Sequence, residues 1–314
     1  MKTSAAEIRN SHVSAVLLAL LVTFLWSTSW VLIKAGLRQN LPPLTFAGLR
    51  YSLAFLCLAP FVLLNGAHRK SIVNFSRADW RRLILLGFVF YTLTQGAQFL
   101  SLVFLPAATL TLILNFSPVF VAVSSNIINK EKPQLTQWIG ILLSVTGAVI
   151  YFYPLVLPAE QSLGFIVASV AVLSNSGASL LGRKINYQTG LSPVVVTTIS
   201  MGFGGILLLL TGIVTQGFGD INFVQWLIIA WLAVINTAVA FTLWNKTLQT
   251  LTAVESSVIN NLMLPQIALL AWIFLGESLT AGEITGLILV GIGALTVQLW
   301  RQLPAVFRNF IPKN

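Results

Sequence analysis

The chain has 314 residues, of which 56% are hydrophobic and only 8% are charged, against roughly 25% charged residues in an ordinary soluble domain. This composition excludes a water-soluble fold and predicts an all-α integral membrane protein. In a soluble protein a net charge of +10 would suggest nucleic acid as a partner. In a membrane protein it predicts instead that a basic face contacts anionic lipid headgroups, and we expect no nucleic-acid partner.

Apolar runs of about 20 residues, the length that crosses roughly 30 Å of hydrocarbon, follow one another along the chain. The first run is too long for a signal-peptide core and has no obvious cleavage site, so we expect an uncleaved span. Ten transmembrane helices are predicted, at 14–34, 43–64, 83–104, 106–129, 135–153, 163–182, 192–214, 224–245, 251–275 and 281–300.

The second five spans repeat features of the first five. Pro118 recurs as Pro265, and the group Glu131, Gly140 and Gly147 recurs with identical internal spacing as Glu277, Gly286 and Gly293. Residues 14–153 and 163–300 are therefore expected to form two five-helix repeats. Because five is odd, the second repeat must cross the bilayer upside down relative to the first, which is the inverted-repeat plan of secondary transporters.

The basic residues alternate between loops as the ten-span topology requires. If the N-terminus is inside, Arg38 alone falls on the outer side, and the short-loop rule then places both termini in the cytoplasm of a cell membrane protein. The residues on the inner side are Lys2, Arg9, Arg69, Lys70, Arg77, Arg81, Arg82, Lys130, Lys132, Arg183, Lys184, Lys246, Arg301, Arg308 and Lys313.

Three of the eight acids fit the capping box, in which an acid bonds back to the amide at a helix start. The boxes are predicted at Ser76 to Asp79, Thr252 to Glu255 and Thr280 to Glu283. Glu255 is the acid deepest in the membrane, so a proton-relay role stays open beside capping, and Lys246 could pair with it. Glu131 and Glu277 end their spans, where we weigh a paired role against a solvated interfacial charge.

Two cations lie within predicted spans. Arg50 falls about seven residues into the second span, roughly 10 Å below the outer surface. It could extend outward to the interface, but an intramembrane arginine is a functional candidate, and Lys34 near the outer end of the first span adds to the positive potential there.

Pro118 and Pro265 lie near the middle of spans four and nine, where proline removes a backbone hydrogen bond and should kink or break the helix. The amide side chains of Asn115, Asn260 and Asn261 lie beside these positions. Lipid does not tolerate such a polar spot, so we expect it to face a protein-lined cavity with the two prolines acting as hinges or gates, although proline is also common in membrane helices for packing alone.

Polar stripes at helical spacing in other spans together point toward the same cavity, although each residue taken singly is more often an interhelical contact than a ligand. A chamber of amides, hydroxyls and aromatic rings without a deep carboxylate suits neutral, zwitterionic or weakly anionic metabolites. The predicted substrate-binding residues are Trp30, Tyr91, Gln95, Gln98, Asn115, Asn175, Trp244, Asn260 and Asn261.

Several of these residues together resemble the EamA family of the drug/metabolite transporter superfamily. The resemblance rests on Trp26-Ser27-Thr28-Ser29-Trp30 with Lys34, on Pro43 and Arg50, on Ser117-Pro118 with Glu131, and on Asn260-Asn261, Pro265 and Leu275-Gly276-Glu277. It implies a ten-helix inverted-repeat carrier with a central cavity, commonly an exporter of amino acids or related metabolites. The first span lacks the glutamate of small multidrug relatives, which counts against proton-coupled export of drug cations.

We therefore predict a secondary transporter that works by alternating access, with proton exchange, antiport of a counter-substrate and downhill flow as open alternatives for its energy coupling. The absence of a G-x-x-x-x-G-K-[ST] motif gives no support for direct ATP drive, and no Cys/His cluster suggests a metal or cofactor. A membrane-embedded enzyme or scaffold is the rival, but no catalytic constellation is visible, so no catalytic residue is predicted. The small-residue pattern of Gly282 and Gly286 fits packing within the monomer or a homodimer face.

Overall fold

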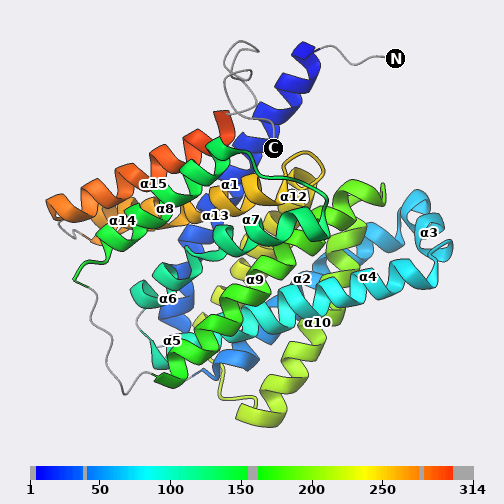
Figure 1. Cartoon of the computed structure of the whole chain (residues 1–314). Coiled ribbons are helices and arrows are strands. Elements are labelled where there is room, and N and C mark those ends of the chain that lie inside the picture. Colours follow the sequence, from blue (N-terminus) through cyan, green and yellow to red (C-terminus); the bar gives the residue numbers. More distant parts are fainter. Residues whose placement is uncertain (1–4, 38–40, 106, 155–161, 276–278, 300–314) are drawn as a thin grey trace.

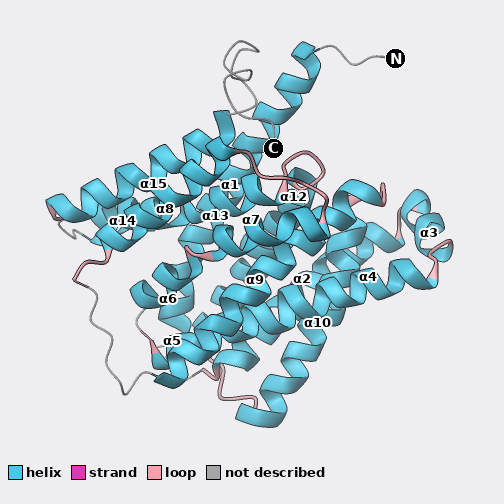
Figure 2. Cartoon of the chain, in the orientation of Figure 1, coloured by secondary structure: helices cyan, strands magenta, loops and turns pink. Residues whose placement is uncertain are grey.

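The computed structural model describes residues 5–37, 41–105, 107–154, 162–275 and 279–299, and this part of the chain is built of helices with no strand (Figures 1 and 2). The first half contains α1 (Ala5–Leu37), α2 (Pro43–Leu63), α3 (Gly66–Val73), α4 (Arg77–Gly87), η1 (Phe88–Gln95), α5 (Gly96–Phe104), α6 (Ala107–Leu114), α7 (Ser117–Ile128) and α8 (Leu135–Tyr151). The second half contains α9 (Ser162–Gln188), α10 (Pro193–Gln216), α11 (Phe223–Ala233), η3 (Val234–Val239), α12 (Ala240–Thr247), α13 (Ala253–Asn261), α14 (Met263–Leu275) and α15 (Ala281–Leu299).

Eight helical stretches in the described part of the chain are long and apolar enough to cross a membrane. The predicted fifth span corresponds to α8, which is apolar but has only 17 residues. The predicted ninth span is divided between α13 and α14, neither of which has more than 13 residues. Length and composition therefore support eight spans directly, and the remaining two predicted spans coincide with shorter helices.

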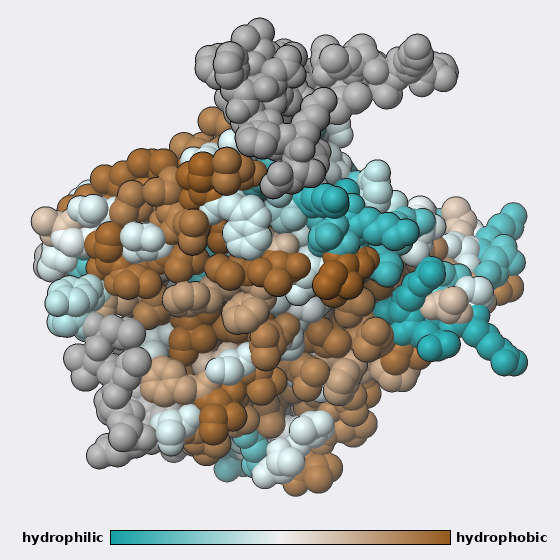
Figure 3. Space-filling model, viewed as in Figure 1, coloured by the Kyte–Doolittle hydropathy of each residue, from teal (hydrophilic) through white to brown (hydrophobic). Residues whose placement is uncertain are grey.

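The outer surface is apolar over most of the face in Figure 3, and hydrophilic side chains gather over α3 and the start of α4. Large hydrophobic side chains such as Leu142, Trp231 and Trp272 are more than half exposed, as expected where the solvent is lipid. The basic side chains Arg69 and Lys70 of α3 are exposed at the hydrophilic end. This division matches an apolar belt bounded by a basic interface.

The equivalent helices α8 and α15 pack against each other along two pairs of glycines. A Cβ placed on Gly140 would lie 2.6 Å from the carbonyl oxygen of Gly293, and one placed on Gly147 would lie 2.6 Å from that of Gly286. The helices are antiparallel, because the earlier glycine of each meets the later glycine of the other. Gly286 and Gly293 lie 146 residues after Gly140 and Gly147, so the two contacts are equivalent to each other. Such a reciprocal contact is what a two-fold relation between the repeats requires. The packing of Gly286 found here is within one chain.

The second span of each half packs in the same antiparallel manner. Gly212 of α10 lies against the backbone of Thr45 in α2, where an added Cβ would be 2.5 Å from the Thr45 nitrogen. Toward the other end of the pair, Gly205 meets Tyr51, with 2.9 Å between the added Cβ and the tyrosine Cβ. Small residues therefore allow both pairs of equivalent helices to approach backbone to backbone.

The third span of each half contains a π-helical segment at an equivalent position. The segment η1 begins at Phe88 and η3 begins at Val234, which is 146 residues later. A π-helical segment inside a membrane helix leaves carbonyl groups out of the regular ladder, and such segments are frequent at functional sites.

The predicted spans four and nine are both broken, as expected from their prolines. The helix α6 ends at Leu114 and α7 begins at Ser117, while α13 ends at Asn261 and α14 begins at Met263. Pro118 and Pro265 lie in the first turn of the helix that follows each break, where a missing N–H costs least. The three predicted capping boxes are confirmed by hydrogen bonds at Ser76, Thr252 and Thr280.

Candidate functional site

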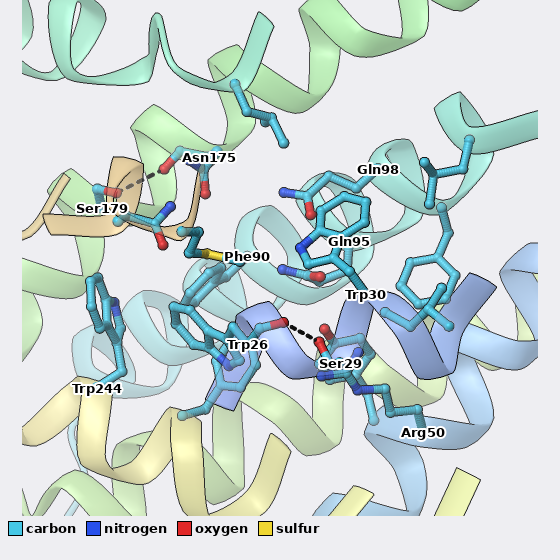
Figure 4. Close-up of a pocket in the computed structure, with 18 residues that line it drawn as sticks. Trp26, Ser29, Trp30, Arg50, Phe90, Gln95, Gln98, Asn175, Ser179 and Trp244 are labelled. Atoms are coloured by element: carbon cyan, nitrogen blue, oxygen red, sulfur yellow. Dashed lines mark hydrogen bonds between the residues drawn. The ribbon is translucent and has the colours of Figure 1, made fainter. Parts of the chain in front are cut away.

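A central pocket lies between the two halves of the chain, with a volume of about 90 Å³, room for several water molecules (Figure 4). The first half lines it through α1, α2, η1, α5 and α6, and the second half through α9, α12, α13 and α14. The helix breaks reach it directly, since Leu114, Asn260 and Met263 are among the lining residues. Neither repeat forms this pocket alone.

Aromatic rings from both halves form a continuous wall. The ring of Trp26 lies 4.8 Å from that of Phe241 and 5.0 Å from that of Trp244, centroid to centroid. Phe241 also contacts Phe90 at 5.1 Å and Tyr51 at 5.8 Å. Tilted and edge-on rings at these separations form stable packing and leave ring faces on which an apolar or aromatic solute can stack.

Amide side chains supply the polar part of the lining. The side chains of Gln95 and Gln98 have no hydrogen-bond partner among the described residues, and the Oδ1 atom of Asn260 is buried without one. By contrast, Asn175 donates to the Ser117 hydroxyl at 3.2 Å. Buried amides are ordinarily satisfied, so the unpaired ones are available to water or to a ligand.

Arg50 lines the pocket and is only 3% exposed. Its Nε donates to the Thr237 hydroxyl at 2.6 Å, and an Nη atom donates to the Asn236 carbonyl at 3.2 Å. The same carbonyl accepts a hydrogen bond from Trp26 Nε1 at 3.1 Å. Both acceptors belong to η3, so the π-helical segment holds the arginine in place rather than letting it extend to the membrane surface.

Six of the nine predicted substrate-binding residues meet in this pocket, and three lie beside it. Tyr91 is fully buried against the rings of Tyr51 and Phe90. The Asn261 side-chain amide donates to the backbone carbonyl of Asn115 at 2.8 Å, and the Asn115 side chain donates to the Thr111 carbonyl at 2.9 Å. The six that line the pocket are Trp30, Gln95, Gln98, Asn175, Trp244 and Asn260.

Sequence reasoning missed several lining residues. It did not select the aromatic residues Tyr51, Phe90 and Phe241 because they are indistinguishable by type from the many membrane-facing rings. A signal was present for Trp26, which lies one helical turn before Trp30 and on the same face. Ser29 also lines the pocket and donates to the Trp26 carbonyl at 2.6 Å.

Glu131 forms an ion pair with Arg183 of α9, with 2.8 Å between Oε1 and Nε. Its other oxygen accepts from the amide of Ala253 at 3.2 Å, at the start of α13. Arg183 also donates to the Leu248 carbonyl at 2.9 Å. Glu131, which follows α7, therefore connects to α9 and α13, two helices that also line the pocket. Glu277 lies outside the described residues.

Glu255 is fully buried and forms the predicted capping box, but its charged partner is not Lys246. One oxygen caps the Thr252 amide at 2.7 Å, and the other lies 3.3 Å from His12 Nε2. Lys246, considered from the sequence as a possible partner, is exposed at the end of α12 and forms no ion pair within the described chain. The capping geometry turns the carboxylate toward α1, and Lys246 extends to the surface. The side chain of Lys34 lies outside the described part of the structure.

The Gln298 amide of α15 donates to the Glu255 carbonyl at 3.0 Å. The start of α1 and the end of α15 therefore meet at the start of α13, at one end of the bundle (Figure 1). Within the described residues, no three His, Cys, Asp or Glu side chains gather to form a metal site.

Comparison with known proteins identifies a family. The model of the EamA-like transporter family matches twice, over residues 13–153 and 162–299. A solved crystal structure superposes with a TM-score of 0.76 at 19% sequence identity, covering 93% of this chain and 99% of that one, which supports the fold.

Curated relatives of the chain are named as transporters. The uncharacterized transporter YvbV of Bacillus subtilis is 28% identical, with 88% of each chain covered. The probable amino-acid metabolite efflux pump of Salmonella typhimurium is 26% identical, covering 88% of this chain and 92% of the relative. The S-adenosylmethionine/S-adenosylhomocysteine transporter of Chlamydia trachomatis is 23% identical, covering 92% and 90% respectively.

Proposed function

Because the chain belongs to the EamA-like transporter family, we propose that it is a secondary carrier that exports small metabolites by alternating access through the central pocket. The family and the relatives are named as transporters, which supports small-molecule substrates and a membrane setting for this chain and argues against an enzyme. Beyond membership of this family, we propose a topology, a direction of transport, a substrate class and a binding site.

The proposed topology has ten spans in two inverted repeats, residues 14–153 and 163–300, with both termini in the cytoplasm. Eight long apolar helices, α8 and the divided pair α13 and α14 together account for ten crossings. The antiparallel glycine contacts between α8 and α15 support the inversion, since equivalent helices run in opposite directions. The start of α1 and the end of α15 both contact the start of α13. The two ends of the helical bundle sequence therefore lie on the same side, which supports an even number of crossings.

The observation that carries the proposal is the pocket shared by both repeats. A site at the repeat interface can be exposed alternately to either side when one repeat rocks against the other. The breaks before Pro118 and Pro265 reach this pocket, so we assign them the role of hinges. Glu131 and Arg183 close one side through their contact with α13, about 10 Å along that helix from Asn260, at 1.5 Å per residue.

The chemistry of the lining supports amino acids and related neutral, zwitterionic or weakly anionic metabolites as substrates. Of the 18 described lining residues, Arg50 alone is charged. A purely cationic solute would meet no counterion there, whereas amides and indoles can bind polar groups and aromatic walls can bind an apolar body. A relative named as an amino-acid metabolite efflux pump fits this class.

The experiment is counterflow in proteoliposomes that contain the purified chain. Vesicles preloaded with one unlabelled amino acid, nucleoside or organic acid are diluted into the same labelled compound, and uptake is followed over time. We expect saturable, transient accumulation for at least one compound and its loss in Gln98→Leu. Trp272→Ala, on the exposed face of α14, serves as the matched control.

Absence of counterflow for every compound would overturn the proposal, and so would either of two further results. Non-saturating equilibration without transient accumulation would indicate a channel. Chemical conversion of the labelled compound without its crossing the bilayer would indicate the rival class, a membrane-embedded enzyme.

A further inference from the structure

Within the described part of the chain, Arg50 is a buried cation without an acidic partner. It lies seven residues after the start of α2, about 10 Å along the helix, and is 3% exposed. The ion pairs of the described residues join His12 to Glu255, Arg82 to Asp79 and Arg183 to Glu131, and none includes Arg50. A buried charge is costly unless an opposite charge or a full set of hydrogen bonds compensates it.

Neutral hydrogen-bond acceptors bind only some of the N–H donors of the Arg50 guanidinium. Its contacts with Thr237 and Asn236 use two of the five N–H donors, and the ring of Tyr51 lies 5.3 Å from the guanidinium carbon. The other donors have no partner among the described residues. A planar guanidinium that is fixed through some of its N–H groups is suited to bind a carboxylate through the rest.

The surroundings favour a single negative charge on a largely apolar molecule. Arg50 and Ser29 lie at one end of the view in Figure 4, and Asn175 and Ser179 lie at the other. The rings of Trp26 and Phe241, one from each half of the chain, contact each other and form an aromatic wall of the pocket. No acidic residue is among the described residues that line the pocket, so one monoanion would neutralise it.

We infer that Arg50 binds the carboxylate of the transported molecule, so that the substrates are small monocarboxylates with an apolar or aromatic body, including amino acids. This inference rests on the proposed function, because it assigns a ligand to the same pocket. The amide oxygens of Gln98 and Asn260 are then available to accept hydrogen bonds from the ammonium group of an amino acid.

Binding of matched ligands tests the assignment without requiring transport. Trp26, Trp30 and Trp244 line the pocket, so quenching of intrinsic fluorescence reports occupancy of the chain in nanodiscs. The probes are 3-phenylpropionate and its neutral amide, L-phenylalanine and L-phenylalaninamide, and phenylphosphate as a different anion. We expect each carboxylate to bind at least about tenfold more tightly than its amide, the scale of a charge-assisted hydrogen bond.

Three variants separate a ligand contact from a structural role. Arg50→Gln should abolish the preference for acid over amide, whereas Arg50→Lys should retain part of it. Thr237→Val removes one anchor of Arg50 but keeps the charge, so the preference should persist even if the chain is less stable. Thermal midpoints of all variants identify any loss of folding, and Arg50→Lys keeps the test decisive if Arg50→Gln does not fold.

The results separate this inference from the proposed function. Three results in the unmodified chain would overturn the role of Arg50. They are equal affinity for acid and amide, no saturable binding of any carboxylate, and tighter binding of phenylphosphate than of the carboxylates. An unchanged preference in Arg50→Gln would do the same, even if counterflow is observed. A clear acid preference without counterflow of any compound would instead uphold the carboxylate site and overturn the carrier.

Discussion

The side-chain amide of Asn261 donates a hydrogen bond of 2.8 Å to the backbone carbonyl of Asn115, and this bond joins the helix breaks of the two repeats. Both residues are buried, at 5% and 3% exposed respectively. A break in a membrane helix leaves carbonyl groups that lipid cannot satisfy, and here each break lies beside the other. The two proposed hinges are therefore in direct contact, so a movement of one must change the surroundings of the other.

Asn261→Leu should abolish transport in proteoliposomes while leaving membrane insertion intact. The substitution removes the amide and leaves the Asn115 carbonyl without this donor, at a cost of about 1–3 kcal/mol. Counterflow and the thermal midpoint should both fall. Asn260→Leu is the matched comparison, because its side chain lines the pocket and it should weaken substrate binding with a smaller effect on stability. Unchanged flux in Asn261→Leu would remove this bond from the mechanism.

Glu131→Gln should make the pocket more accessible from the side that Glu131 and Arg183 close. The neutral amide loses the ion pair with Arg183, which weakens the connection between α9 and α13. In a Cys57→Ser background, Ser179→Cys places a thiol in the pocket, and its labelling by a membrane-impermeant maleimide in inside-out vesicles should become faster.

Asp79→Asn is the control for that measurement, since the Asp79 pair with Arg82 is exposed and lies at the start of α4. Equal labelling rates in Glu131→Gln and Asp79→Asn would show that the ion pair is not a closure of the pocket.

Gly293→Ala should destabilise the chain, whereas Gly291→Ala on the same helix should not. A Cβ at position 293 would lie 2.5 Å from the Gly140 carbonyl oxygen, and one at position 291 meets nothing within 4 Å. Overpacking of a close helix contact costs about 1–3 kcal/mol. Thermal midpoints of the two variants, measured by size-exclusion chromatography after heating, should differ clearly. Similar midpoints would contradict the backbone contact between α8 and α15.

Pro118→Ala and Pro265→Ala should slow counterflow without weakening ligand binding. Each proline lies in the first turn of the helix after a break, and alanine there would allow the helix to continue through the break. Stopped-flow measurement of exchange rates, together with fluorescence titration, distinguishes the two effects. Pro60→Ala in α2 is a suitable control because Pro60 is exposed and lies outside the pocket. A change in affinity with an unchanged rate would assign the prolines to the binding site instead of the hinges.

Several features of this protein could be predicted from the sequence because they depend on local pattern. The capping boxes at Ser76 and Thr252 need only an acid three residues after the cap, and both are confirmed. The breaks in the predicted spans four and nine could be expected from Pro118 and Pro265, since a proline in mid-span removes a backbone hydrogen bond and kinks or breaks the helix.

The π-helical segments could not be predicted in the same way. No residue in Phe88–Gln95 or Val234–Val239 demands a π-helical turn, and the segments are evident only from the structure. The partner of Glu255 was also out of reach, because His12 precedes it by 243 residues and only the packing of α1 against α13 brings them together.

By itself, the sequence determined the class of protein, the approximate helices, the duplication and most of the polar residues of the pocket, because composition and periodicity report the solvent that each helix meets. Only the tertiary structure decided which of those residues share a pocket and which satisfy each other. Asn260 and Asn261 are neighbours in the chain, yet one lines the pocket and the other bonds to Asn115. Successive positions on a helix differ by about 100° in direction, so the orientation of α13 among its neighbours fixes the role of each.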